Sequence, residues 1–201
     1  MPVPITSLSL LARARAHEPA AWNRIVDLYA PLVYSWCRRQ SLQEADALDV
    51  GQEVFRSVYV HLSAYRRDRP GDSFRGWLKT ITRNKVSDAR RRGRNRELAG
   101  GGVVDHLAQQ PAGPPDPGDD DSERKAVLRR AMELVRGDVA PRTWAAFWLA
   151  TIEGRPVPEV ATELGVSENA VYLAKSRTVR RLRAMYGELV EGLDDGAGTG
   201  G

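Results

Sequence analysis

The chain has 201 residues and 42% hydrophobic content, which is enough for one large packed domain or two small ones. Lysine and arginine number 30 against 26 acidic residues, so the formal charge is only +4 and its distribution is more informative than its sum. Cys37 is the only cysteine, which excludes an intramolecular disulfide and a cysteine-based zinc cluster.

Apolar runs along the chain are short. Residues 7–16 come closest to the core of a signal peptide, but Arg13 and Arg15 interrupt them. No run approaches the roughly 20 apolar residues that span a bilayer. We therefore expect no membrane insertion and a protein that stays in the cytoplasm.

Apolar residues recur at helical spacing and strand-like alternation is missing, so we expect an all-α fold. The pattern predicts helices over residues 19–40, 43–64, 74–92, 123–136, 140–153, 158–164 and 168–189. Glycine and proline gather between residues 100 and 122, where no aromatic residue occurs. We expect two small helical domains, 1–98 and 123–191, the second with a helix-turn-helix. A flexible linker (99–122) joins them, and a disordered tail (192–201) follows.

The predicted helix over residues 43–64 is acidic on one face. Every charge from Ser41 to Phe55 is negative, and at about 100° per residue these acids lie opposite the apolar Val50 and Val54. Such a face is usually only solvated surface, but it is also a candidate for docking a basic protein surface. The candidate contact residues are Asp46, Asp49, Gln52 and Glu53.

The next predicted helix is strongly basic. From Arg75 to Arg96 the chain has nine lysines and arginines against the single acid Asp88. Phe74 and Trp77 belong to an apolar stripe, so we expect Trp77 in the core, while the cations favour phosphate contact. The polar loop before this helix is either a pocket for an unstacked base or an ordinary connector. The DNA-binding candidates here are Arg66, Arg67, Asp68, Ser73, Lys79, Thr80, Arg83, Asn84, Asp88 and Arg91.

Residues 158–171 contain the helix-start, turn and N-cap residues that are typical of a helix-turn-helix. Pro158 suits the first position of a helix, Gly165 suits a tight turn, and Ser167 is a good N-cap for the next helix. The second helix carries the cations and the first does not, as expected of a helix that reads the major groove. The alternative is a helical hairpin without function. The DNA-binding candidates are Ser167, Glu168, Asn169, Tyr172, Lys175, Arg177 and Arg180.

In this order, these segments resemble the extracytoplasmic-function sigma factors of bacterial RNA polymerase. Residues 46–55 look like the family's acidic helix, which implies that Asp49, Gln52 and Glu53 contact the clamp helices of the largest polymerase subunit. Residues 74–85 resemble the segment that reads and opens the melted region, and the preceding loop resembles the one that captures a flipped minus-ten base. Residues 158–183 are similar to the reader of the minus-thirty-five element. Gly51 departs from the larger aliphatic residue common in the family and loosens the acidic helix.

The resemblance implies a sigma factor that recognises both promoter elements and assists strand opening, with core RNA polymerase and promoter DNA as partners. We expect no enzyme activity, catalytic residue, metal, cofactor or small-molecule substrate. The resemblance does not tell whether an anti-sigma factor exists, which promoter sequence is recognised or which signal induces the protein. One rival is a stand-alone regulator that binds duplex DNA as a dimer. Another is a nucleic-acid enzyme with a metal at Asp46, Asp49 and Glu53, although no histidine lies near them in sequence.

Overall fold

The computed structural model describes residues 10–66, 72–98 and 120–187. Every regular element in these ranges is helical and none is a strand, which confirms the all-α expectation. The chain divides into two compact units, one of Leu11–Glu123 and the other of Met1–Leu10 with Arg124–Gly201. Within the described ranges, no helix is both long enough and apolar enough to cross a membrane.

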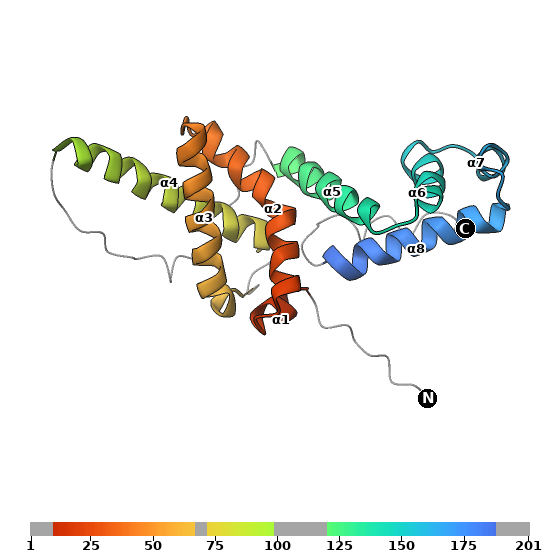
Figure 1. Ribbon diagram of the computed structural model, residues 1–201, viewed down its shortest axis with the longest axis horizontal. Coiled ribbons are helices and arrows are strands. Elements are labelled where there is room, and N and C mark those ends of the chain that lie inside the picture. The colour runs from red at the N-terminus through yellow and green to blue at the C-terminus, as the bar shows by residue number, and fades with distance from the viewer. Residues whose placement is uncertain (1–9, 67–71, 99–119, 188–201) are drawn as a thin grey trace. The chain divides into compact units, whose positions relative to one another are not determined.

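Three long helices build the first unit: α2 (Pro19–Arg39), α3 (Glu44–His61) and α4 (Phe74–Leu98). They pack against one another (Figure 1), and a 3₁₀ turn, η1 (Leu62–Ala64), follows α3 directly. Their apolar stripes meet in a core of fully buried side chains: Ile25, Leu28, Val33, Val54, Val58, Leu78 and Val86. Burial of this stripe, at roughly 1.5–3 kcal/mol for each large side chain, stabilises the packing.

Cys37 lies in this core, as expected of a small apolar residue. Its side chain is completely buried, and burial raises the pKa of the thiol to about 11. A thiol held in this form is a poor nucleophile and a poor metal ligand, because both roles require the thiolate.

A short helix that periodicity does not predict, α1 (Leu10–Arg15), precedes α2. Six residues are too few for a helical pattern to stand out in the sequence. Arg15 ties the segment to the end of η1, because its guanidinium donates to the backbone oxygens of Leu62 (3.2 Å) and Tyr65 (2.8 Å). Arg15, one of the two arginines that interrupt the apolar residues 7–16, therefore has a structural role.

The second unit contains α5 from Arg124 onward, α6 (Pro141–Phe147), the π-helical turn η3 (Trp148–Ile152), α7 (Val157–Leu164) and α8 (Glu168–Tyr186). Helices α6, α7 and α8 pack against one another (Figure 1). Their shared core contains the buried residues Ala146, Val160, Ala161, Val171 and Ala174, with Leu164 and Val166 packed at its edge.

Gly165 makes the turn between α7 and α8. Its φ of 58° and ψ of 46° are left-handed, a conformation that glycine adopts without a steric penalty. The N–H of Gly165 bonds to the oxygen of Thr162, and the N–H of Val166 bonds to the oxygen of Ala161, which together form a Schellman motif. The turn predicted at Gly165 is confirmed.

Element boundaries differ from the prediction at three places. Helix α4 continues through Gly93 to Leu98, because one glycine weakens a helix without ending it. Residues 148–152, predicted as α-helix, form the π-helical turn η3. Helix α5 (Asp120–Gly137) begins inside the range expected for the linker. The rest of that linker and the expected tail lie outside the described residues.

Gly51→Ala is expected to stabilise the chain by up to about 1 kcal/mol, because alanine is the better helix former. Gly51 lies inside α3, and a Cβ built there meets no atom within 4 Å. The midpoint of urea unfolding, followed by far-UV circular dichroism, measures the change. Gly165→Ala should act in the opposite direction by about 1–2 kcal/mol, because it forces a side chain into a left-handed conformation. Destabilisation by Gly51→Ala would show that the helix is strained at that position.

Candidate nucleic-acid interface

The outward face of α3 carries three of the four acidic-helix candidates in full exposure: Asp46, Asp49 and Gln52. Their helix is held by the burial of Ala47, Val50 and Val54 on its opposite side, as predicted. The face also contains a residue that the charge pattern did not reveal. Leu48 lies next to Gln52 on the helical wheel, at the edge of this face, and is 54% exposed. An exposed apolar side chain beside polar ones is typical of a protein-docking surface.

Glu53, the fourth candidate, lies at the edge of this face against α4. Its carboxylate accepts two hydrogen bonds from Arg92, at 3.0 Å from Nη1 to Oε1 and 2.9 Å from Nη2 to Oε2. This paired geometry is the strong form of an arginine–carboxylate contact. The bonds from Arg92 hold the pKa of Glu53 below its ordinary value, and the opposing effect of burial is smaller. Glu53 therefore joins the acidic helix to the basic one.

Glu53→Gln is expected to lower stability at neutral pH by up to about 1 kcal/mol, the range of a partly exposed ion pair. Because the pKa of Glu53 is lowered in the folded chain, its contribution is present above the unfolded-state pKa and disappears as the pH falls through the folded-state pKa. Urea midpoints of both proteins should therefore differ at neutral pH and converge in acid. Asp49→Asn, an exposed change of the same kind on the same helix, is the control and should leave the urea midpoint at neutral pH nearly unchanged.

The outward face of α4 carries four of the ten minus-ten candidates. Thr80, Arg83, Asn84 and Arg91 share one side of the helix, opposite the buried Leu78. Ser87 is exposed at the centre of the same side, and its spacing of four residues from Arg83 and Arg91 is the signal that identifies it.

Four of the α4 candidates have partners within the described part of the protein. Arg91 Nη2 donates to Asp88 Oδ1 at 2.7 Å, and Thr80 Oγ1 donates to the backbone oxygen of Gly76 at 3.1 Å. Lys79 lies at the edge of the face, and its Nζ is 3.0 Å from Oε1 of Glu123. Asp88 therefore orients a neighbouring arginine, and Lys79 belongs to a separate network.

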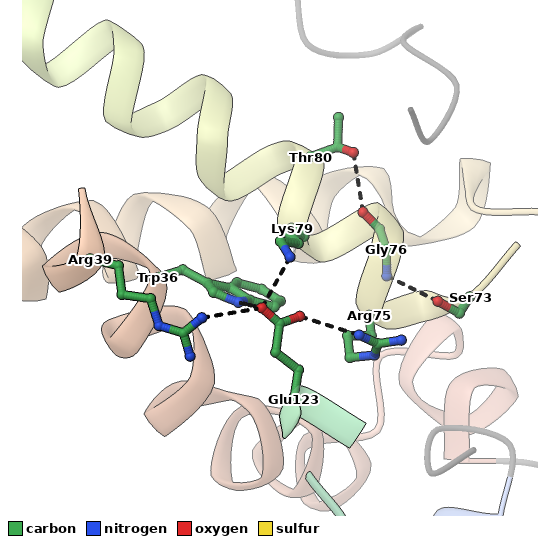
Figure 2. A network of polar contacts seen from close by, with 8 residues as sticks. All are labelled: Trp36, Arg39, Ser73, Arg75, Gly76, Lys79, Thr80 and Glu123. Carbon is green, nitrogen blue, oxygen red and sulfur yellow. Dashed lines mark hydrogen bonds and ion pairs between the residues drawn. The ribbon is translucent and has the colours of Figure 1, made fainter. Parts of the chain in front are cut away.

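The loop candidates are only partly described. Arg66 is exposed, and its guanidinium donates to the backbone oxygens of Ser63 and Tyr65. Arg67 and Asp68 lie outside the described residues. Ser73 has a structural role, since its Oγ accepts a hydrogen bond from the N–H of Gly76 at 3.1 Å and caps the start of α4 (Figure 2).

An aromatic cluster lies at the junction between the loop and α4. The rings of Tyr65, Phe74 and Trp77 contact one another at centroid distances of 5.1–5.7 Å. Phe74 is buried, but Trp77 is only half-buried, so the expectation of a core tryptophan holds only in part. One ring that is partly exposed beside a polar loop suits contact with an unstacked base.

In the second unit, all seven minus-thirty-five candidates are exposed. Asn169, Tyr172 and Arg180 lie near the centre of the outward face of α8, and Lys175 and Arg177 lie on its two flanks. Leu173 and Ser176 are exposed at the same centre, although the charge pattern did not single them out. The Oγ of Ser167 accepts the N–H of Ala170 at 3.2 Å, so Ser167 is the N-cap predicted from the sequence.

Arg142 fixes the turn that orients this face. Its Nε donates to the backbone oxygen of Leu164 at 3.1 Å, and its Nη2 donates to the oxygen of Gly165 at 3.0 Å. These carbonyls end α7 and have no partner within that helix. No sequence pattern pointed to this contact, because Arg142 lies on α6, 22 residues before Leu164.

Comparisons with known proteins agree with this arrangement. A model of sigma-70 region 2 matches residues 25–96. The ECF RNA polymerase sigma factor SigE of Mycolicibacterium smegmatis is 34% identical over 166 residues, covering 81% of this chain and 60% of that protein. SigL of Mycobacterium tuberculosis, also an ECF RNA polymerase sigma factor, is 25% identical over 185 residues, covering 90% of this chain and 98% of that protein.

Among solved structures, a complex of RsbN and BldN matches at 24% sequence identity and a TM-score of 0.36, covering 86% of this chain and 96% of that one. The chain spans 60% of the length of SigE. The match to sigma-70 region 2 covers most of α2, all of α3 and most of α4. The chain is similar to the extracytoplasmic-function sigma factors, as the resemblance of its motifs implied.

Proposed function

We propose that this protein is a sigma factor that binds core RNA polymerase and directs promoter-specific initiation of transcription. The proposal rests on one observation within residues 25–96, the segment that matches sigma-70 region 2. In this segment the outward face of α3 is acidic, and the outward face of the neighbouring α4 is basic. These two faces suit two different partners, a basic protein surface and the phosphates of DNA.

The outward face of α3 is the proposed polymerase-binding surface. Asp49 and Gln52, with Asp46 to one side, provide the polar contacts, and Leu48 provides an exposed apolar contact at the other edge. Charges at the rim of such a surface speed encounter and fix the register of docking. Glu53 contributes from the edge while it remains bonded to Arg92.

The outward face of α8 is the proposed reader of the minus-thirty-five element. Asn169, Tyr172 and Arg180 point away from the core of their unit and can reach base edges in the major groove. Lys175 and Arg177 flank them on both sides, where the phosphate backbones of a groove-bound helix run.

The outward face of α4 and the loop before it are the proposed minus-ten surface. Arg83 and Arg91 meet phosphate, while Thr80 and Asn84 offer groups that can bond to bases. The partly exposed ring of Trp77 can stack on an unpaired base. Preference for single-stranded over duplex DNA would then drive strand opening, because a ligand shifts an equilibrium only by its differential affinity.

In this proposal the protein works by binding and breaks no bond, so it is not an enzyme. It acts in the cytoplasm, where core polymerase operates. We place the polymerase-binding and melting domain at residues 1–98 and the helix-turn-helix domain at residues 123–191. The segment between them, residues 99–122, is the proposed linker, of which residues 120–122 belong to the start of α5, and residues 192–201 are the proposed tail.

Reconstituted transcription tests the proposal. Purified core polymerase is mixed with the full chain and a library of bacterial promoter fragments, and the run-off transcripts are sequenced. We expect transcripts to start at a shared pair of upstream elements and to disappear when the chain is omitted. If core polymerase neither binds the chain nor initiates in its presence, the proposal is wrong. If the chain nevertheless binds duplex operators as a dimer, it is a stand-alone regulator.

A further inference from the structure

A cluster of cations surrounds one buried carboxylate in the first unit (Figure 2). Glu123, the last residue of that unit, is completely buried. Its Oε1 accepts hydrogen bonds from Trp36 Nε1 at 2.7 Å and from Lys79 Nζ at 3.0 Å, and its Oε2 accepts one from Arg75 Nη1 at 3.2 Å. Arg39 Nη1 lies 3.6 Å from Oε1.

All four donors belong to α2 and α4, within the match to region 2, whereas the carboxylate comes from the first turn of α5. Three of the donors carry a formal positive charge, and Glu123 carries one negative charge. A buried ionic group must be paired and hydrogen-bonded to be tolerated. The cluster is therefore an anion site formed by region 2, and Glu123 is its resident anion.

The chemistry of the site also fits a phosphodiester. A backbone phosphate carries the same single negative charge as a carboxylate and likewise presents two unshared oxygens. Guanidinium groups bind either anion through two parallel bonds, and Arg75 and Arg39 provide two of them. The side chain of Arg39 is 48% exposed, so the site reaches the protein surface on that side.

The position of the site on α4 favours nucleic acid over other anions. Lys79 borders the outward face that carries Thr80 and Arg83, the proposed minus-ten surface. Lys79 Nζ also lies 5.8 Å from the centroid of the Trp36 ring, so the cation is held between the indole and the carboxylate. A strand that follows the face of α4 has a phosphate within reach of this lysine.

We propose that Trp36, Arg39, Arg75 and Lys79 form a phosphate-binding site for single-stranded promoter DNA, and that Glu123 occupies it as an internal competitor. The inference rests on the proposed function for the identity of the ligand. DNA enters the site when the side chain of Glu123 leaves it. Glu123 therefore weakens DNA binding by the free chain and is displaced when DNA binds.

Anisotropy of a labelled, mixed-sequence single-stranded oligodeoxynucleotide, titrated with the full chain, tests the competition. Glu123→Gln keeps the size of the side chain and removes its charge. At about 0.1 M salt, one additional phosphate contact should raise affinity about fivefold and steepen the salt dependence by about 0.7. Adding Lys79→Gln to this variant should remove most of the gain.

Asp121→Asn is the matched control, because it changes the net charge equally at an exposed position two residues away in α5. It should leave affinity nearly unchanged. An equal gain from both variants would mean that only net charge matters, and no gain from Glu123→Gln would also overturn the inference. Neither result touches the proposed function, since core polymerase is absent from the assay.

Loss of the buried carboxylate also destabilises the cluster, so a second measurement uses the unaltered protein. With 5-fluorotryptophan incorporated, the fluorine signal of Trp36 is assigned by comparison with Trp36→Phe. Adding the same oligonucleotide should shift this signal, because the partner of the indole N–H changes from carboxylate to phosphate. The signals of Trp144 and Trp148, in the other unit, are the internal reference. If DNA binds while the Trp36 signal stays in place, the site does not take phosphate.

Discussion

Asp49→Arg is expected to weaken binding to core RNA polymerase by about 3 kcal/mol, or roughly 100-fold, and to remove promoter-specific transcription. Asp49 is exposed on α3 beside Leu48, at the centre of the proposed polymerase-binding surface. The change deletes an attractive charge and places a repulsive one against a basic partner. Co-purification with core polymerase and run-off transcription measure the two effects.

Glu133→Arg is the control for this charge reversal. Glu133 is exposed on α5 and pairs only with Arg130 among its neighbours in the described structure, a surface contact of small energy. The substitution Glu133→Arg produces the same change in net charge and should leave the affinity for core polymerase within a factor of about two of that of the unaltered protein. If both variants lose binding equally, or if neither does, α3 is not the docking surface.

Replacing Lys175 and Arg177 together with alanine is expected to flatten the salt dependence of duplex DNA binding. Each phosphate contact contributes about 0.9 to the slope of the logarithm of affinity against the logarithm of salt concentration, so the pair should remove about 1.8. At about 0.1 M salt this corresponds to roughly 60-fold weaker binding. Because phosphate contacts carry no sequence information, the loss should be similar for promoter and non-promoter duplexes.

The matched control removes two exposed cations from another helix, Arg129 and Arg136 of α5. Titrations of the full chain at several salt concentrations should show little change in the slope for this pair. An unchanged slope for the Lys175 and Arg177 pair would mean that the flanks of α8 do not meet phosphate. A loss confined to promoter sequences would instead assign these residues to base reading.

Much of this architecture could be predicted because its signals are local. Helical periodicity located α2, α3 and α8 to within a few residues, and the glycine and serine around the turn located the Schellman motif and the N-cap. Ser167 also shows the limit of such reasoning. Ser167 was predicted both as a cap and as a DNA contact; its Oγ accepts a backbone N–H, which confirms the cap, and the DNA contact stays a prediction.

The contacts that could not be predicted join residues that are distant in sequence. Glu53 and Arg92 are 39 residues apart, and Trp36 and Glu123 are 87 residues apart. Charge patterns reveal which residues face outward, but not which cation on a neighbouring helix lies opposite a given acid. Leu48 was missed for a different reason, since an exposed apolar residue leaves no charge to notice.

The division of α8 into a buried side and an outward side has a practical consequence. Val171 and Ala174 hold the fold, whereas Asn169 and Tyr172 contribute nothing to the buried cluster. Substitutions at such exposed positions usually change stability by less than about 0.5 kcal/mol. The residues of the proposed promoter-reading surface can therefore be exchanged, by selection or by design, while the scaffold that presents them stays intact.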